Sequence, residues 1–123
     1  MTIMEAIHIV DERKPNTYSQ ADKIRWLATL DAMVHGGVLA GYEGFDGTPF
    51  PGYGGDTPPE TVLLMESPYD ECYIRWLEAQ IAYADGEYDK YNNAMALFNT
   101  LWNAFRNHYN RTRMHKGGRM VFF

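Results

Sequence analysis

The sequence lacks most of the features that mark secreted, membrane or redox proteins. Cys72 is the only cysteine among 123 residues, so the chain can form neither an internal disulfide nor a cysteine-based metal site. No apolar run approaches the length of about 18 residues that a transmembrane helix needs. The first residues also lack the order of basic, apolar and small residues that makes a secretory signal. We therefore expect no membrane contact and synthesis in a cytoplasm.

Acidic residues are absent from the last part of the chain. Residues 1–89 carry all sixteen acidic residues against five basic ones, a formal charge of −11, whereas residues 90–123 carry the other six basic residues, a charge of +6. An acidic body with a basic end predicts head-to-tail contacts between copies, or an acidic partner for the basic end.

Residue patterns typical of catalysis are also missing. The single cysteine falls within an apolar helical pattern, no serine has a nucleophile-elbow setting, and the glycine-rich stretch contains no lysine for a phosphate loop. The histidines show no metal-ligand spacing; they are His8, His35, His108 and His115. We expect a protein without enzymatic activity, metal or cofactor.

Four helices are predicted, which makes the fold class all-α. Thr2 and Glu5 have the spacing of a capping box for a helix over residues 2–13, and Ser19 with Asp22 starts a second helix that closes at Gly36. The inner rows of these two helices are predicted as Ile3, Ile7 and Val10, and as Ile24, Leu27, Leu30 and Val34, with Trp26 and Met33 broadening the second.

Residues 68–109 predict a helical hairpin that carries most of the hydrophobic surface. Ser67 and Pro68 start its first arm, and Gly86 supplies the left-handed residue that ends it. Aromatic and apolar residues follow the second arm at alternating spacings of three and four, a stripe that we expect to pack against two other helices. This stripe is Tyr88, Tyr91, Met95, Phe98, Trp102, Phe105 and Tyr109.

The opposite side of the second arm has an unusual composition. No charged residue lies between Tyr91 and Phe105, and the polar positions are Asn92, Asn93, Asn99, Thr100 and Asn103. Asparagine is a poor helix former, so packing must hold this helix together. The face is either a solvated surface of uncommon composition or a contact with another subunit, with Asn92, Asn99 and Asn103 as the candidate contacts.

Two segments without helical periodicity complete the chain. The stretch over residues 41–66 is rich in glycine and proline, which excludes regular helix, yet it holds aromatic residues that disordered linkers lack. We expect Tyr42, Phe45, Phe50 and Tyr53 to contact a partner or a neighbouring copy, and residues 61–65 to form a short strand or an extended segment. We divide the chain into a helical domain, residues 1–110, and a basic tail, residues 111–123, whose apolar last residues should be docked on a surface.

Several segments resemble the small head–tail connector (adaptor) proteins of tailed bacteriophages. They are Tyr18-Ser19, Lys23-Ile24-Arg25-Trp26-Leu27, Leu30-Asp31, Pro68-Tyr69-Asp70-Glu71, Tyr88-Asp89-Lys90-Tyr91-Asn92-Asn93-Ala94-Met95-Ala96-Leu97-Phe98-Asn99 and Tyr109-Asn110-Arg111. The resemblance covers nearly the whole chain and departs over residues 41–60, which are richer in glycine and proline than the family pattern.

The resemblance implies a bundle of about four helices that assembles as a ring, usually of twelve copies, under the portal of the virion. Such a ring extends the DNA channel and carries the next neck or tail protein, with no cofactor and no catalytic step. The C-terminal segment of the family commonly reaches the portal. The resemblance therefore implies that the portal is contacted by Arg111, Arg113, Lys116, Arg119, Phe122 and Phe123. The expected location is the neck of the virion, after synthesis in the host bacterial cytoplasm.

A different class of protein remains open. Basic residues in a flexible end can neutralise phosphates without reading a base sequence, so the chain could be a small helical DNA-binding or regulatory protein. The acidic body argues against this alternative because it repels DNA.

Overall fold

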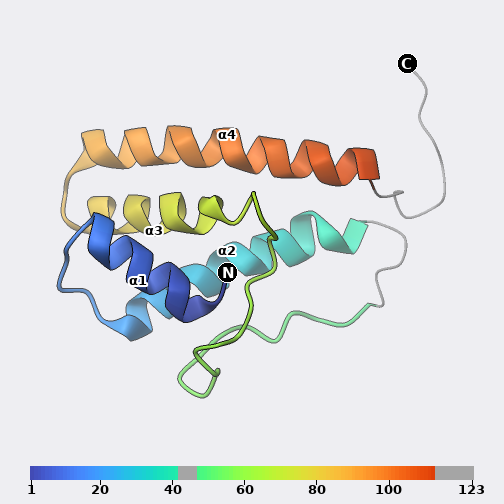
Figure 1. Cartoon of the computed structure of the whole chain (residues 1–123), viewed down its shortest axis with the longest axis horizontal. Helices are drawn as coiled ribbons and strands as arrows, with labels where there is room; N and C mark the ends of the chain where they lie inside the picture. The colour runs from blue at the N-terminus through green and yellow to red at the C-terminus, as the bar shows by residue number, and fades with distance from the viewer. Residues whose placement is uncertain (42–46, 113–123) are drawn as a thin grey trace.

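The computed structural model describes residues 1–41 and 47–112, and these residues form an all-α fold without strands. The helices are α1 (Ile3–Arg13), α2 (Gln20–Gly37), the short 3-10 helix η1 (Leu39–Gly41), α3 (Glu71–Ala84) and α4 (Tyr88–Thr112). Helix α3 lies in the middle, with α4 along one side of it and α1 and α2 along the other (Figure 1). The chain therefore forms a bundle in which one helix contacts all three others.

The predicted starts of α1 and α2 and the hairpin turn before α4 are confirmed. The amide of Glu5 donates to Thr2 Oγ1 at 3.1 Å and the amide of Thr2 donates to Glu5 Oε1 at 3.3 Å, which completes the capping box of α1. The amide of Asp22 donates to Ser19 Oγ at 3.1 Å at the start of α2. Gly86 has a φ of +77°, the left-handed conformation that ends α3 before the chain reverses into α4.

The predicted start of α3 is wrong by a few residues. The helix begins at Glu71 with Asp70 as its N-cap, while the cis Ser67-Pro68 peptide bond lies within a tight turn. In that turn the amide of Tyr69 donates to the carbonyl of Glu66 at 2.9 Å. A backbone that turns here cannot also provide the first turn of a helix.

The segment after the glycine-rich stretch is extended rather than a strand of a sheet. Its bridge to the N-terminus joins Thr2 and Val62. The amide of Leu63 donates to the carbonyl of Met1 at 2.9 Å, and the amide of Ile3 donates to that of Thr61 at 3.0 Å. These bonds satisfy backbone groups ahead of α1 and place Leu63 in the core.

The core lies between α3 and the α1 and α2 layer. The inner rows are buried as predicted, except that Ile24 and Trp26 are half-buried and Met33 is exposed. Helix α4 buries only three side chains, and of the helices in the described part of the chain it contacts α3 alone. The expectation that α4 packs against two helices is therefore wrong, because α1 and α2 occupy the opposite side of α3. The core side chains include Ile3, Ile7, Val10, Leu27, Leu30, Val34, Leu63, Met65, Ile74, Leu77, Ile81, Phe98 and Phe105.

None of the helices that the structure describes is both long and apolar enough to cross a membrane.

Candidate interaction surface

The inner side of α4 is a continuous row of aromatic contacts with α3 and the turn before it. Phe98 contacts Trp76 at a centroid distance of 5.3 Å and stacks on Trp102 at 5.9 Å. Phe105 contacts Tyr69 at 5.8 Å. Aromatic pairs of this kind add to the stabilisation from apolar burial. This packing explains how a helix with so many asparagines forms.

The side of α4 that is turned away from α3 contacts no other helix among the described residues. All five residues of its polar face are exposed, namely Asn92, Asn93, Asn99, Thr100 and Asn103. The four asparagine side chains make no hydrogen bond within the described part of the chain, and Thr100 Oγ1 donates to the carbonyl of Ala96 on the same helix at 3.1 Å. Leu97, on the same helix, is 49% exposed. Leu97 and Asn93 lie at the edge of this side of α4, where they also line a hollow between the end of α1, α3 and α4. We call the surface formed by these six residues the α4 outer face.

Exposed aromatic rings lie at the hairpin turn, at one end of α4. Tyr83 and Tyr88 are 59% and 58% exposed, and their rings lie 5.7 Å apart. Tyr83 also contacts Tyr91 at 5.3 Å. Tyrosine is enriched in protein interfaces because it buries apolar area while its hydroxyl still forms hydrogen bonds.

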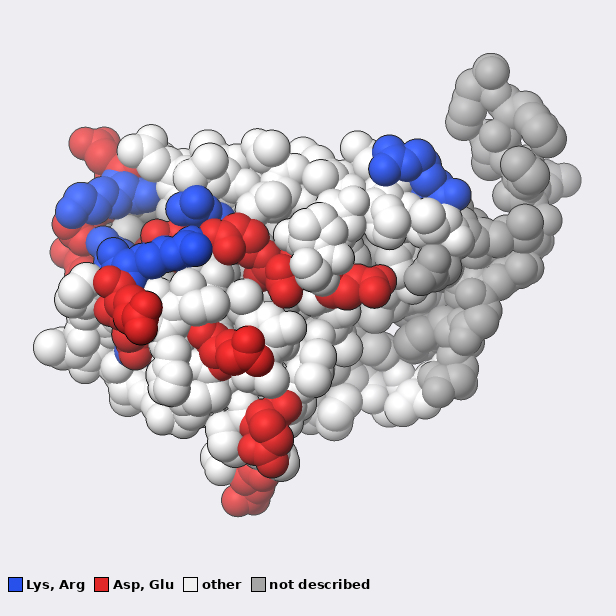
Figure 2. All heavy atoms as spheres, viewed as in Figure 1, with Lys and Arg blue, Asp and Glu red and all other residues white. Residues whose placement is uncertain are grey.

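A shallow hollow of about 560 Å³ lies between the end of α1, α3 and α4. Its charged side chains are paired with each other: Lys14 Nζ lies 3.0 Å from Glu87 Oε1, and Lys90 Nζ lies 2.7 Å from Glu87 Oε2. The hydrogen bonds from Lys90 and Lys14 lower the pKa of Glu87 to about 2. Figure 2 shows this alternation of blue and red atoms. Because the cations are already neutralised, the hollow is poorly suited to binding a phosphate.

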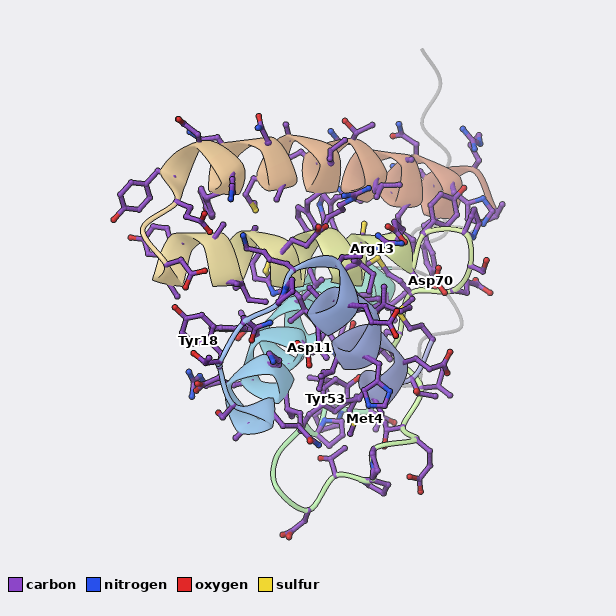
Figure 3. The ribbon with its side chains drawn as sticks, turned by 60° about the vertical axis from the view of Figure 1, so that its left-hand side comes forward. Met4, Asp11, Arg13, Tyr18, Tyr53 and Asp70 are labelled. Atoms are coloured by element: carbon purple, nitrogen blue, oxygen red, sulfur yellow. The ribbon has the colours of Figure 1, made fainter. Side chains whose placement is uncertain are left out.

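The structure reveals a buried carboxylate that we did not predict from the sequence. Asp31 of α2 is fully buried and accepts hydrogen bonds from Tyr73 Oη at 2.6 Å, Tyr53 Oη at 2.5 Å and the Leu64 amide at 3.1 Å. Burial raises the pKa of Asp31 although these donors oppose the shift. Tyr53 reaches Asp31 from the loop below the helices (Figure 3). The cluster therefore fastens the loop, α2 and α3 to one another.

An ion pair with a buried lysine joins α1 and α2. Lys23 is only 4% exposed, and its Nζ lies 2.8 Å from Asp11 Oδ1. The same oxygen accepts a hydrogen bond from Asn16 Nδ2 at 3.0 Å. The pair fixes the connection between α1 and α2.

The sequence does contain a signal for both buried charges. Lys23, Leu27, Asp31 and Val34 follow one another at helical spacings of four, four and three, so the two charged residues lie on the inward row of α2. A charge on an apolar row indicates a buried pair or hydrogen-bonded cluster.

The predicted contact residues have different surroundings. Tyr53 is half-buried with its hydroxyl on Asp31, and Phe50 is half-buried against the Tyr53 ring at a centroid distance of 5.1 Å. Arg111 is exposed near the end of α4. The other predicted contacts lie outside the described residues; these are Tyr42, Phe45, Arg113, Lys116, Arg119, Phe122 and Phe123. The roles of all these residues in contacts with other proteins stay predictions.

The described residues contain no group of three or more potential metal ligands. Cys72 is buried, and burial raises the pKa of its thiol to about 12, so little reactive thiolate forms near neutral pH.

No protein-family model, curated protein or solved structure matches this chain.

Proposed function

We propose that this protein is a structural subunit of a bacteriophage virion, a head–tail connector that assembles as a ring under the portal. The α4 outer face is the observation that carries the proposal. Among the described residues, this helix of 25 residues contacts a single other helix, and the polar side chains of its outer face are uncharged. The resemblance of the sequence to connector proteins supplies the kind of assembly.

The composition of the α4 outer face suits a contact between proteins. Burying a charged side chain costs far more free energy than burying an amide that finds a hydrogen-bond partner. Asn99 and Asn103 can each donate and accept across an interface, and Leu97 adds apolar area. Charged residues are depleted at the centres of interfaces in the same way.

A ring requires a heterologous contact, in which one surface of a subunit meets a different surface of the next. The α4 outer face supplies one such surface. In this proposal the aromatic residues of the loop, Tyr42, Phe45, Phe50 and Tyr53, contribute to the neighbouring subunit or to the next ring. The tail contacts the portal through Arg111, Arg113, Lys116, Arg119, Phe122 and Phe123. The portal then templates the ring, which we expect to hold twelve copies.

The charge distribution suits a channel through which DNA passes. The strongly acidic body repels the phosphate backbone, so DNA can slide without accumulating contacts. Neutralising exposed acidic residues should then slow DNA passage during ejection. Unchanged ejection would count against a lumen-facing acidic wall.

The test is native mass spectrometry of this chain alone and mixed with the portal ring encoded by the same genome. The chain alone should be a monomer or a weak oligomer, and the mixture should gain a fixed number of copies per portal. Absence of a complex would contradict the proposal.

The second candidate, a DNA-binding protein, is favoured by the exposed arginines at the end of α4. It predicts binding to duplex DNA that weakens steeply with added salt, because phosphate contacts release counterions. A connector should bind free duplex DNA hardly at all under the same conditions.

A further inference from the structure

Ion pairing separates the basic side chains of the described residues into two groups. Six of them have a carboxylate partner, with N–O distances from 2.5 to 3.1 Å; they are Arg13, Lys14, Lys23, Arg25, Arg75 and Lys90. Arg106 and Arg111, near the C-terminal end of α4, are exposed and have no carboxylate partner in the part of the chain that the structure describes. Every paired cation therefore lies in the body, and the two free ones lie at one end.

Two carboxylates on the projecting loop, those of Asp56 and Glu60, also lack an ion-pair partner among the described residues. Both residues are exposed. The nearby main chain is well fixed: the Gly54 amide donates to Thr57 Oγ1 at 2.8 Å, and the Thr57 amide donates to the carbonyl of Gly54 at 3.1 Å. These bonds hold Asp56 within a closed turn.

The other side of this loop is attached to α1. The amide of Met4 donates to the carbonyl of Pro59 at 3.1 Å, and the amide of Thr61 donates to that of Pro58 at 3.0 Å. Tyr53, just before the loop, is bound to Asp31. The two carboxylates are thus displayed on an ordered support, and a partner that binds them pays little for ordering the loop.

The free arginines and the free carboxylates do not meet within one copy. Figure 2 shows blue atoms over the C-terminal end of α4 and red atoms on the loop that projects on the opposite side of the molecule. Opposite free charges on different surfaces of one chain complement each other between two copies. The sequence after Arg111 contains three more basic residues and no acidic one.

We propose that Arg106 and Arg111 of one copy bind Asp56 and Glu60 of a second copy. The contact is heterologous, so successive copies join in one direction and close into a ring when the rotation allows it. The inference rests on the proposed function, since it identifies the charged part of the contact between ring subunits. It also assigns Arg111 to the neighbouring subunit instead of the portal.

The test is cysteine crosslinking with a short bis-maleimide at low salt, in a chain whose own Cys72 is buried. Asn107→Cys, next to Arg106, and Gly55→Cys, next to Asp56, are made separately at exposed positions, so that all four charged residues of the contact are kept. The mixture of the two should give a crosslinked dimer that neither variant gives alone. The double variant should give a ladder of higher species, as a directional contact requires. Glu12→Cys, at an exposed position on α1, is the matched control and should give no product with Asn107→Cys.

Charge exchange supplies the second measurement. Arg106→Glu with Arg111→Glu in the Asn107→Cys chain, or Asp56→Arg with Glu60→Arg in the Gly55→Cys chain, should each lower the yield of the mixed dimer at least about fivefold, and a mixture of the two charge-exchanged chains should recover it. Raising the salt concentration should lower the yield of the mixed dimer between Asn107→Cys and Gly55→Cys in the same way. An arginine that only stabilises the end of α4 would leave the yield unchanged.

Two results would overturn this contact: no mixed dimer between the two cysteine variants, or equal products from each variant alone. Neither result affects the number of copies bound to the portal, so failure of this inference can be distinguished from failure of the proposed function.

Discussion

The α1 to α3 bundle and helix α4 differ in where their polar groups find partners. In the bundle, even charged side chains are satisfied internally: Asp31 accepts three hydrogen bonds and Lys23 is paired with Asp11. On α4, the side chains of Asn92, Asn93, Asn99 and Asn103 make no hydrogen bond within the described residues. The polar groups of the bundle are satisfied within one chain, whereas the polar face of α4 leaves groups available for the contact with another subunit that we propose.

Removing Asp31 should have the largest effect on the bundle. Asp31→Ala leaves the hydroxyls of Tyr53 and Tyr73 and the Leu64 amide without their acceptor, so we expect the free energy of unfolding to fall by about 4 kcal/mol. Urea unfolding followed by circular dichroism measures it. Asp31→Asn, which keeps the shape and one acceptor, should lose less. An unchanged midpoint for Asp31→Ala would show that the cluster does not hold the loop.

Matched leucine truncations sharpen the comparison. Leu77 of α3 is fully buried, so Leu77→Ala should cost about 3 kcal/mol through lost burial and the remaining cavity. Leu97→Ala on the α4 outer face should change monomer stability by less than about 1 kcal/mol, because Leu97 is 49% exposed. Thermal unfolding of both variants measures the two losses of stability. The number of copies bound per portal is the second measurement, and we expect Leu97→Ala to lower it. Equal losses of stability in Leu77→Ala and Leu97→Ala would contradict the distinction between the buried bundle and the exposed α4 outer face.

Acid should act in opposite directions on two carboxylates. The pKa of Glu87 is lowered to about 2 by Lys90 and Lys14, so its contribution to stability is present above the ordinary pKa of about 4.5 and is lost as the pH falls toward 2. Burial raises the pKa of Asp31, so protonation of Asp31 favours the folded chain as the pH falls through that raised value. The free energy of unfolding measured against pH should therefore lose less on acidification in Glu87→Gln than in wild type. The free energy of unfolding should fall more on acidification in Asp31→Asn than in wild type. If all three proteins showed the same dependence of stability on pH, the directions of both pKa shifts would be contradicted.

Much of the bundle could be predicted from the sequence because its signals are local. Thr2 with Glu5 and Ser19 with Asp22 are caps read from a few neighbouring residues, and the inner rows follow helical spacing. The start of α3 was misplaced because proline suits a tight turn as well as the first position of a helix, and the structure places Pro68 in a turn closed by the Tyr69 amide and the Glu66 carbonyl.

The arrangement around α4 and the buried polar cluster depend on the tertiary structure. The width of the apolar stripe on α4 could not reveal that α1 and α2 lie beyond α3. Asp31 lies on an inward row, but its tyrosine donors come from residues 22 and 42 positions away in the chain. For the candidate interface, the composition of the sequence was enough to identify the asparagine face of α4. Which basic side chains are paired with carboxylates, and which are not, could be seen only in the structure.

The central claim is that the α4 outer face contacts another subunit, and charge placed on that face tests it most directly. Asn99→Glu with Asn103→Glu should leave the free energy of unfolding of the isolated chain within about 0.5 kcal/mol of wild type, since both residues are exposed. His8→Glu, at an exposed position on α1, is the matched control. By native mass spectrometry with the portal ring, the control should bind as many copies as wild type, and the double variant should bind far fewer. A full complement of the double variant on the portal would contradict the account.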